Sequence, residues 1–141
     1  MLAIIDYGAG NLFSVANALK FLEIPYTITN ESQTIDAADG VILPGVGAFP
    51  EAMQMLAHQQ LIAPLKKAAA EKPFLGICLG MQMLFDFGYE FTKTAGLGLL
   101  SGEVRQIEAK GQKIPHMGWN SITITQDCPL TYGLHDGDFV Y

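Results

Sequence analysis

Cys78 lies at the centre of the stretch Gly76-Ile77-Cys78-Leu79-Gly80, whose residue types and spacing point to covalent chemistry. This is the Gly-x-nucleophile-x-Gly pattern of a nucleophile elbow, with cysteine in place of serine. The glycines permit a sharp turn from a strand into a helix, and the helix N-terminus favours a thiolate over a thiol. The pattern predicts a nucleophilic cysteine. The alternative is a cysteine that only fills space, because free cysteine is among the most buried residue types.

Backbone amides at two predicted strand ends could bind a ligand. The amide of Leu79 is left unpaired at the start of the predicted helix and can donate to a developing oxyanion. In "LPGVGAF" (43–49), Gly45 and Gly47 flank Val46. Glycines free a loop from steric limits, so that its N–H groups can point at a ligand. By itself, this loop is better explained as an ordinary strand-to-helix turn.

A cysteine nucleophile needs a proton acceptor, usually a histidine oriented by a carboxylate. The candidates are His58 in a predicted helix, His116 in the loop "IPHMGWN" and His135 beside Asp136 in a turn. None is followed by a carboxylate at strand spacing, so none is convincing as the base. Cys128 has neither flanking glycines nor a helix and is predicted to be structural. No pair of residues has metal-ligand spacing on one element, and neither a metal nor a cofactor is expected.

The stretch "DYGAGNL" (6–12) raises the alternative of a phosphate- or nucleotide-binding module. The dinucleotide fingerprint needs a third glycine or alanine three residues beyond the second. Phe13 stands there, and its bulk is expected to block close packing of a helix against a strand. No basic residue lies in any of the glycine loops. Asn11 is better explained as the cap of the following helix.

The composition excludes several classes of partner. A chain of 141 residues, half hydrophobic and 16% charged, suits one well-buried domain. The net charge of −6, with only eight Lys and Arg, argues against nucleic acid. No apolar stretch is long enough to span a bilayer, and the start lacks the charges of a signal peptide. Two cysteines in different contexts argue against disulfides and favour the cytoplasm.

The order of predicted elements is that of an α/β protein with a mainly parallel sheet and helices on both sides. Apolar and β-branched runs predict strands at 2–6, 26–29, 40–44 and 74–77. Helices are expected at 12–22, at 49–72 with a break near Pro64, and at 78–87. After Gly88, short strands are expected at 102–107, 120–125 and 138–141.

Four stretches together resemble the glutaminase subunits of imidazole glycerol phosphate synthases, which are class I (triad) glutamine amidotransferases of histidine biosynthesis. They are "IIDYGAGNL", "LPGVGAF", "GICLGMQ" and "PHMGWN". The likeness runs in order from residue 2 to the end of the chain. It implies a flavodoxin-like three-layer class I glutamine amidotransferase fold and a single domain over 1–141.

The resemblance also implies roles for individual residues. Cys78 would attack the side-chain amide of glutamine and release ammonia, with the amides of Val46 and Leu79 forming the oxyanion hole. The positions that match glutamine-binding residues are Gly45, Gly47 and Gln82. The positions that match the surface facing a cyclase subunit, in a heterodimer, are Asn11, Met117, Trp119 and Asn120.

One departure from the family concerns the catalytic base. In the family, a histidine and a glutamate form a His-x-Glu pair on a late element, whereas this sequence stops at Tyr141 in a strand pattern. The chain is therefore expected to lack the C-terminal part of the fold. A nucleophile and an oxyanion hole would then be present without a complete triad, leaving the chain inactive alone. A different cysteine hydrolase or a redox sensor on a similar elbow is the other alternative.

Overall fold

The computed structural model describes residues 1–141, which form two compact units, Met1–Gln106 and Ile107–Tyr141. The first unit is built on a parallel sheet of four strands in the order β2-β1-β3-β4. These strands are β1 (Leu2–Ile5), β2 (Tyr26–Thr29), β3 (Gly40–Leu43) and β4 (Phe74–Gly76). All four predicted strands are confirmed, each with bounds within one residue of those expected.

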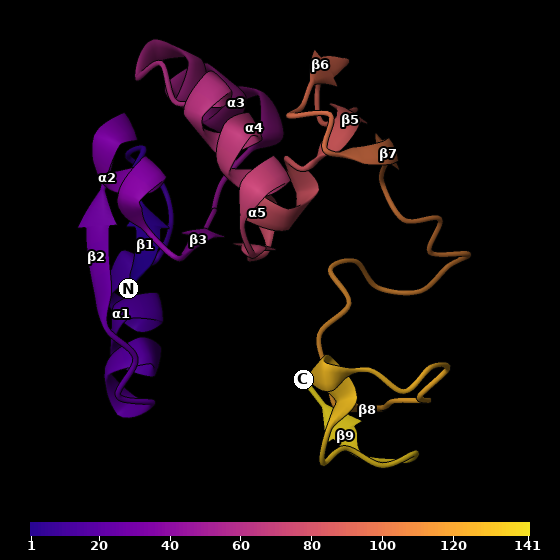
Figure 1. Ribbon diagram of the computed structural model, residues 1–141. Helices are drawn as coiled ribbons and strands as arrows, with labels where there is room; N and C mark the ends of the chain where they lie inside the picture. Colours follow the sequence, from indigo (N-terminus) through magenta and orange to yellow (C-terminus); the bar gives the residue numbers. More distant parts are fainter. The chain divides into compact units, whose positions relative to one another are not determined.

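Helices cover both faces of this sheet (Figure 1). They are α1 (Leu12–Phe21), α2 (Ser32–Ala37), α3 (Phe49–His58), α4 (Ile62–Glu71) and α5 (Leu79–Gln82). Successive strand residues point to opposite faces. Ile4 accordingly packs in one core with Leu19 of α1, whereas Ile5 belongs to the larger core under α2, α3 and α4. The three-layer α/β architecture is therefore confirmed.

The break in the long predicted helix lies earlier than expected. Helix α3 ends at His58, and Gln60 adopts φ +58° before α4 begins. Leu61 N then donates to Leu56 O at 2.9 Å, which closes a left-handed turn at the end of α3. Pro64 does not break the chain, because it occupies the first turn of α4, where no intrahelical partner for its missing N–H is needed.

The predicted helix over 78–87 is wrong in its second half. Helix α5 ends at Gln82, and β5 (Phe85–Gly88) follows. This strand pairs antiparallel with β6 (Thr94–Ala95) and parallel with β7 (Leu100–Val104). Pairing with strands later in the chain overrides the helical pattern, as strand formation depends on context. Helix α2 was not predicted either, since one buried residue, Ile35, gives no periodic signal.

The second unit contains little regular structure. A two-stranded antiparallel ladder joins β8 (Asn120–Ser121) to β9 (Phe139–Val140), and a 3₁₀ helix η1 covers Pro129–Thr131. The strands expected at 120–125 and 138–141 thus exist but are shorter than predicted. That the two units belong to one domain stays a prediction. No helix in either unit combines the length and apolar character needed to cross a bilayer.

Candidate active site

Cys78 forms the sharp connection between β4 and α5. Its backbone has φ +55° and ψ −118°, a conformation that costs a non-glycine residue energy. Its side chain is exposed to solvent. The predicted strand-to-helix turn is therefore present, and a cysteine that merely fills the core is excluded.

The flanking glycines are required by close backbone approach. A Cβ atom added to Gly80 would lie 1.8 Å from Leu43 O, and one added to Gly76 would lie 2.5 Å from Met81 Cα. Both distances are far inside van der Waals contact, and both neighbours are backbone atoms. Glycine at both positions therefore lets α5 begin directly against the end of β3, which places the exposed thiol at the C-terminal edge of the parallel sheet.

The amide at the start of α5 is unpaired. Gly80 N donates to Ile77 O at 3.0 Å, and Met81 N donates to Cys78 O at 3.0 Å. Within residues 1–141, no acceptor is found for Leu79 N, the first amide of the helix. Such an amide, next to the thiol and at the positive end of a helical turn, can donate to an anionic oxygen.

The loop between β3 and α3, residues 44–48, lies against this elbow and is called the β3–α3 loop below. A Cβ on Gly45 would lie 2.6 Å from Gly80 N and 2.9 Å from Leu79 Cβ. Val46, half exposed, has no hydrogen-bond partner for its amide, and Gly47 adopts φ +93°. The structure thus brings Gly45 of the predicted loop against Leu79 and Gly80, the residues that follow Cys78. The amides of Val46 and Leu79 both lack an acceptor within the chain.

Two side chains that sequence analysis missed hold the ends of the β3–α3 loop. Tyr7, fully buried, donates its hydroxyl to Pro44 O at 3.0 Å. Burial and, secondarily, the nearby Cys78 raise the pKa of Tyr7 to about 12. At the other end, Glu90 Oε2 accepts a hydrogen bond from Phe49 N at 2.8 Å and thereby caps α3. The only sequence signal for Tyr7 is its place directly after a buried strand.

Within the first unit, the one histidine, His58, is not hydrogen-bonded to Cys78. His58 is exposed at the end of α3 and lines a cavity of about 350 Å³ on that helix. His116 Nε2 lies 3.1 Å from Asn120 Nδ2. His135 Nδ1 lies 3.7 Å from Asp138 Oδ2, so its carboxylate neighbour is Asp138 rather than the adjacent Asp136. Gln82 ends α5 and is half-buried.

Cys128 differs from Cys78 in its surroundings. It is exposed and precedes η1, where hydrogen bonds from the backbone of Leu130 and from the side chain and backbone of Thr131 lower its pKa. Its own amide donates to Thr131 Oγ1 at 3.0 Å. Reagents that alkylate any thiolate therefore have two accessible targets in this chain, which matters for labelling experiments.

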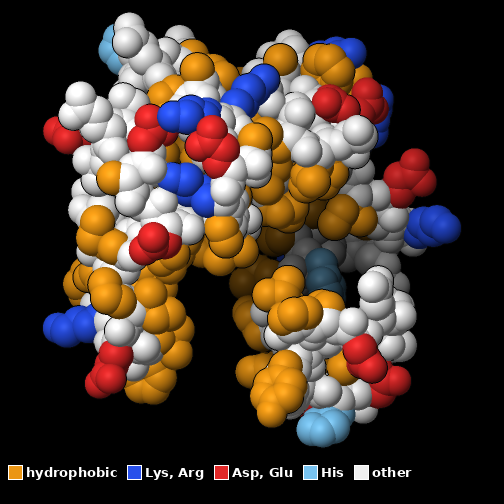
Figure 2. Space-filling model, viewed as in Figure 1, with side chains coloured by type: hydrophobic (Ala, Val, Ile, Leu, Met, Phe, Trp, Pro, Cys, Tyr) orange, Lys and Arg blue, Asp and Glu red, His pale blue; other side chains and the backbone are white.

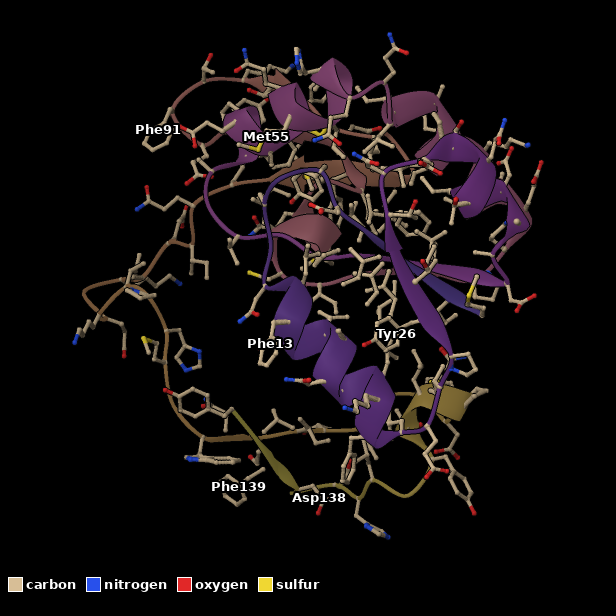
Figure 3. The ribbon with its side chains drawn as sticks, turned by 90° about the vertical axis from the view of Figure 1, so that its left-hand side faces the viewer. Phe13, Tyr26, Met55, Phe91, Asp138 and Phe139 are labelled. Atoms are coloured by element: carbon tan, nitrogen blue, oxygen red, sulfur yellow. The ribbon has the colours of Figure 1, made fainter.

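The residues expected at a partner surface are mostly solvent-accessible. Asn11 Oδ1 accepts from Ser14 N at 3.0 Å, which confirms Asn11 as the cap of α1. Phe13 is 75% exposed and points away from the sheet (Figure 3), so the expectation that its bulk blocks helix–strand packing is wrong. Hydrophobic side chains gather over α1, at the lower left of Figure 2. In the second unit, Met117 and Trp119 are exposed.

Residues 3–140 match the family model of glutamine amidotransferase class-I, and the chain therefore belongs to this family. Among its relatives, the imidazole glycerol phosphate synthase subunit HisH of Bacillus cereus is 51% identical over 142 residues, covering 100% of this chain and 68% of the relative. The HisH subunit of Bacillus cytotoxicus is 48% identical with the same coverage. A crystal structure of a glutamine amidotransferase matches with a TM-score of 0.60 over 72% of this chain and 54% of its own, at 19% identity, which supports the fold.

Proposed function

We propose that this protein is the glutaminase subunit of an imidazole glycerol phosphate synthase in histidine biosynthesis. It hydrolyses glutamine to glutamate and ammonia, and a cyclase subunit receives the ammonia. The observation that carries the proposal is the strained, exposed Cys78 beside the unpaired amide of Leu79. The 51% identity to a HisH subunit supports the choice of this synthase within the family.

The reaction proceeds through two additions to a carbonyl carbon. The thiolate of Cys78 attacks the side-chain amide carbon of glutamine, and the carbonyl oxygen becomes an oxyanion that the amides of Leu79 and Val46 bind. The C–N bond then breaks, the nitrogen takes up a proton and leaves as ammonia, and a glutamyl thioester remains. Water adds to the thioester, the C–S bond breaks, and glutamate leaves with the thiolate restored.

Each part of the elbow has a role in the proposed reaction. The strained turn exposes the thiol at the end of the sheet, and the helix start supplies one fixed donor. Gly45, Gly47 and Gln82 are proposed to hold glutamine. The partner surface is proposed to include Asn11, Met117, Trp119 and Asn120, and the protein is proposed to work in the cytoplasm.

Substitution of the thiol tests the proposal. In the full-length protein assembled with a cyclase subunit, Cys78→Ser is expected to abolish glutamine hydrolysis while leaving partner affinity unchanged. Cys128→Ser is the matched control, because it removes the only other thiol within residues 1–141 and is expected to turn over normally. Steady-state glutamate release measures both. Loss of turnover in Cys128→Ser with activity retained in Cys78→Ser would overturn the proposal.

A further inference from the structure

We infer that Tyr7 is a positioning residue of this site: its hydroxyl fixes the peptide between Pro44 and Gly45 and so holds the start of the β3–α3 loop against the elbow. The inference rests on the proposed function, since the position of this loop matters only if Cys78 attacks a carbonyl carbon. Tyr7 does not touch the reacting atoms. It acts through the backbone of the loop.

The geometry links Tyr7 to two successive residues of the loop. Its hydroxyl donates to Pro44 O at 3.0 Å, and a Cβ placed on Gly45 would lie 2.9 Å from the same hydroxyl oxygen. The side chain is fully buried at the end of β1, so it has no freedom to follow a displaced loop. Because a peptide unit is planar, fixing the carbonyl of Pro44 also fixes the direction of the Gly45 amide.

The rest of the loop has no comparable restraint. The peptides from Gly45 to Val46 and from Val46 to Gly47 make no hydrogen bond within the chain, and the next anchor is Phe49 N on Glu90. The loop is therefore held at both ends and free in the middle, where the Val46 amide lies. Without the hydroxyl of Tyr7, the peptide between Pro44 and Gly45 would also lose its restraint, and the unrestrained segment would begin one peptide closer to β3. The Val46 amide would then spend less time in the position that binds an oxyanion.

The hydroxyl of Tyr7 can serve as a permanent donor. A phenolate could not donate to Pro44 O, so the hydrogen bond requires the protonated form. Burial and, secondarily, the neighbouring Cys78 favour that form by raising the pKa of Tyr7 to about 12, so the hydroxyl stays protonated at neutral pH. The anchor is thus insensitive to the protonation changes that catalysis itself requires.

Removal of the hydroxyl alone tests the inference in the full-length protein assembled with a cyclase subunit. Tyr7→Phe is expected to lower kcat about tenfold, because a tenfold change in rate corresponds to about the net free energy of one hydrogen bond. The KM for glutamine is expected to change less than twofold, since the oxyanion exists only after attack. Tyr26→Phe is the matched control, because no hydrogen bond involves the hydroxyl of that half-buried tyrosine on β2. It is expected to turn over normally.

A second variant separates the hydrogen bond from packing. Tyr7→Met also removes the donor but fills the buried position with a flexible apolar side chain, and it is expected to show the same drop in kcat. Thermal unfolding and partner affinity are measured on all variants, so that rates refer to folded, assembled protein. A purely structural role would lower the unfolding temperature and leave kcat of the assembled protein unchanged, and that result would overturn the inference. If Cys78→Ser is inactive in the same assay, the proposed function survives such a result, whereas an active Cys78→Ser would remove both.

Discussion

Gly80→Ala tests whether the close approach of α5 to β3 is what makes the elbow work. Gly80 lies inside α5, where alanine would ordinarily favour the helix by about 1 kcal/mol. The added Cβ, however, would lie 1.8 Å from Leu43 O, and real Cβ atoms essentially never come closer than 3.0 Å. The two atoms must therefore separate by at least 1.2 Å (3.0 − 1.8), and Leu43 O is also the acceptor of Ile77 N at 3.0 Å.

A displacement of this size has two measurable consequences. Misplacement of a reacting group by about 1 Å can reduce the rate about 10²-fold, so turnover of Gly80→Ala is expected to fall by at least that factor. Overpacking of this kind is also expected to cost about 1–3 kcal/mol of unfolding free energy, opposite in sign to the effect of helix propensity. The assays are steady-state glutamate release in the assembled synthase and denaturant unfolding.

The control for Gly80→Ala is Gly133→Ala, the same chemical change at a glycine with no neighbouring atom within 4 Å of an added Cβ. It carries only the backbone strain of φ +80° and is expected to leave turnover unchanged. If Gly80→Ala turns over within threefold of the unsubstituted protein and is not destabilised, the close-approach explanation of the elbow is refuted.

Three further predictions concern the base, the loop and alkaline pH. The polypeptide of residues 1–141, mixed with a cyclase subunit, is expected to show at least about 10²-fold less glutamate release than ordinary glutaminase turnover, because its sequence offers no convincing base and general base catalysis is worth that much. Normal turnover would instead identify His58, His116 or His135 as the base. In the full-length protein, a ligand-loaded cyclase subunit is expected to raise ammonia release about 10²–10³-fold by ordering the Val46 amide. Gly47 adopts φ +93°, where alanine is strained, so Gly47→Ala should change this activation more than it changes partner affinity. Equal rates with and without the loaded partner would contradict activation through the Val46 amide. Finally, Tyr7 contributes stability that is complete below pH 10 and lost as pH rises from 10.0 toward 12, since the unfolded state releases the proton first. The free energy of unfolding should decline by about 1.4 kcal/mol more between pH 9 and 11 than in Tyr7→Phe, and identical declines would contradict the raised pKa.

The parts of this structure that follow from local patterns were predictable. The strands β1 and β3 are continuous apolar runs, and such runs mark strands buried on both faces. The elbow at Cys78 was predictable because the sharp turn requires small residues on both sides, and the sequence has Gly76 and Gly80 two positions away. Asn11 was predictable as a helix cap because its hydrogen bond reaches only three residues along the chain.

The parts that depend on distant residues were not predictable from the sequence. Tyr7 reaches its partner across 37 residues, and Glu90 reaches Phe49 across 41, so no local pattern signals either hydrogen bond. The early end of α5 has the same origin, because β5 is held by strands that come later in the chain. The orientation of Phe13 was misjudged because its position in a glycine motif does not reveal which face of α1 it occupies.

The identity of the modified cysteine after reaction with a glutamine-derived diazoketone tests the central claim most directly. The reagent requires both recognition of glutamine and attack by a thiolate, so it distinguishes a glutaminase thiol from one that is only accessible. Peptide mapping by mass spectrometry of the assembled synthase is predicted to find one equivalent of label on Cys78, none on Cys128, which is also exposed, and loss of glutamate release in proportion to labelling. Label on Cys128, or full labelling of Cys78 with turnover intact, would contradict the assignment of Cys78 as the nucleophile.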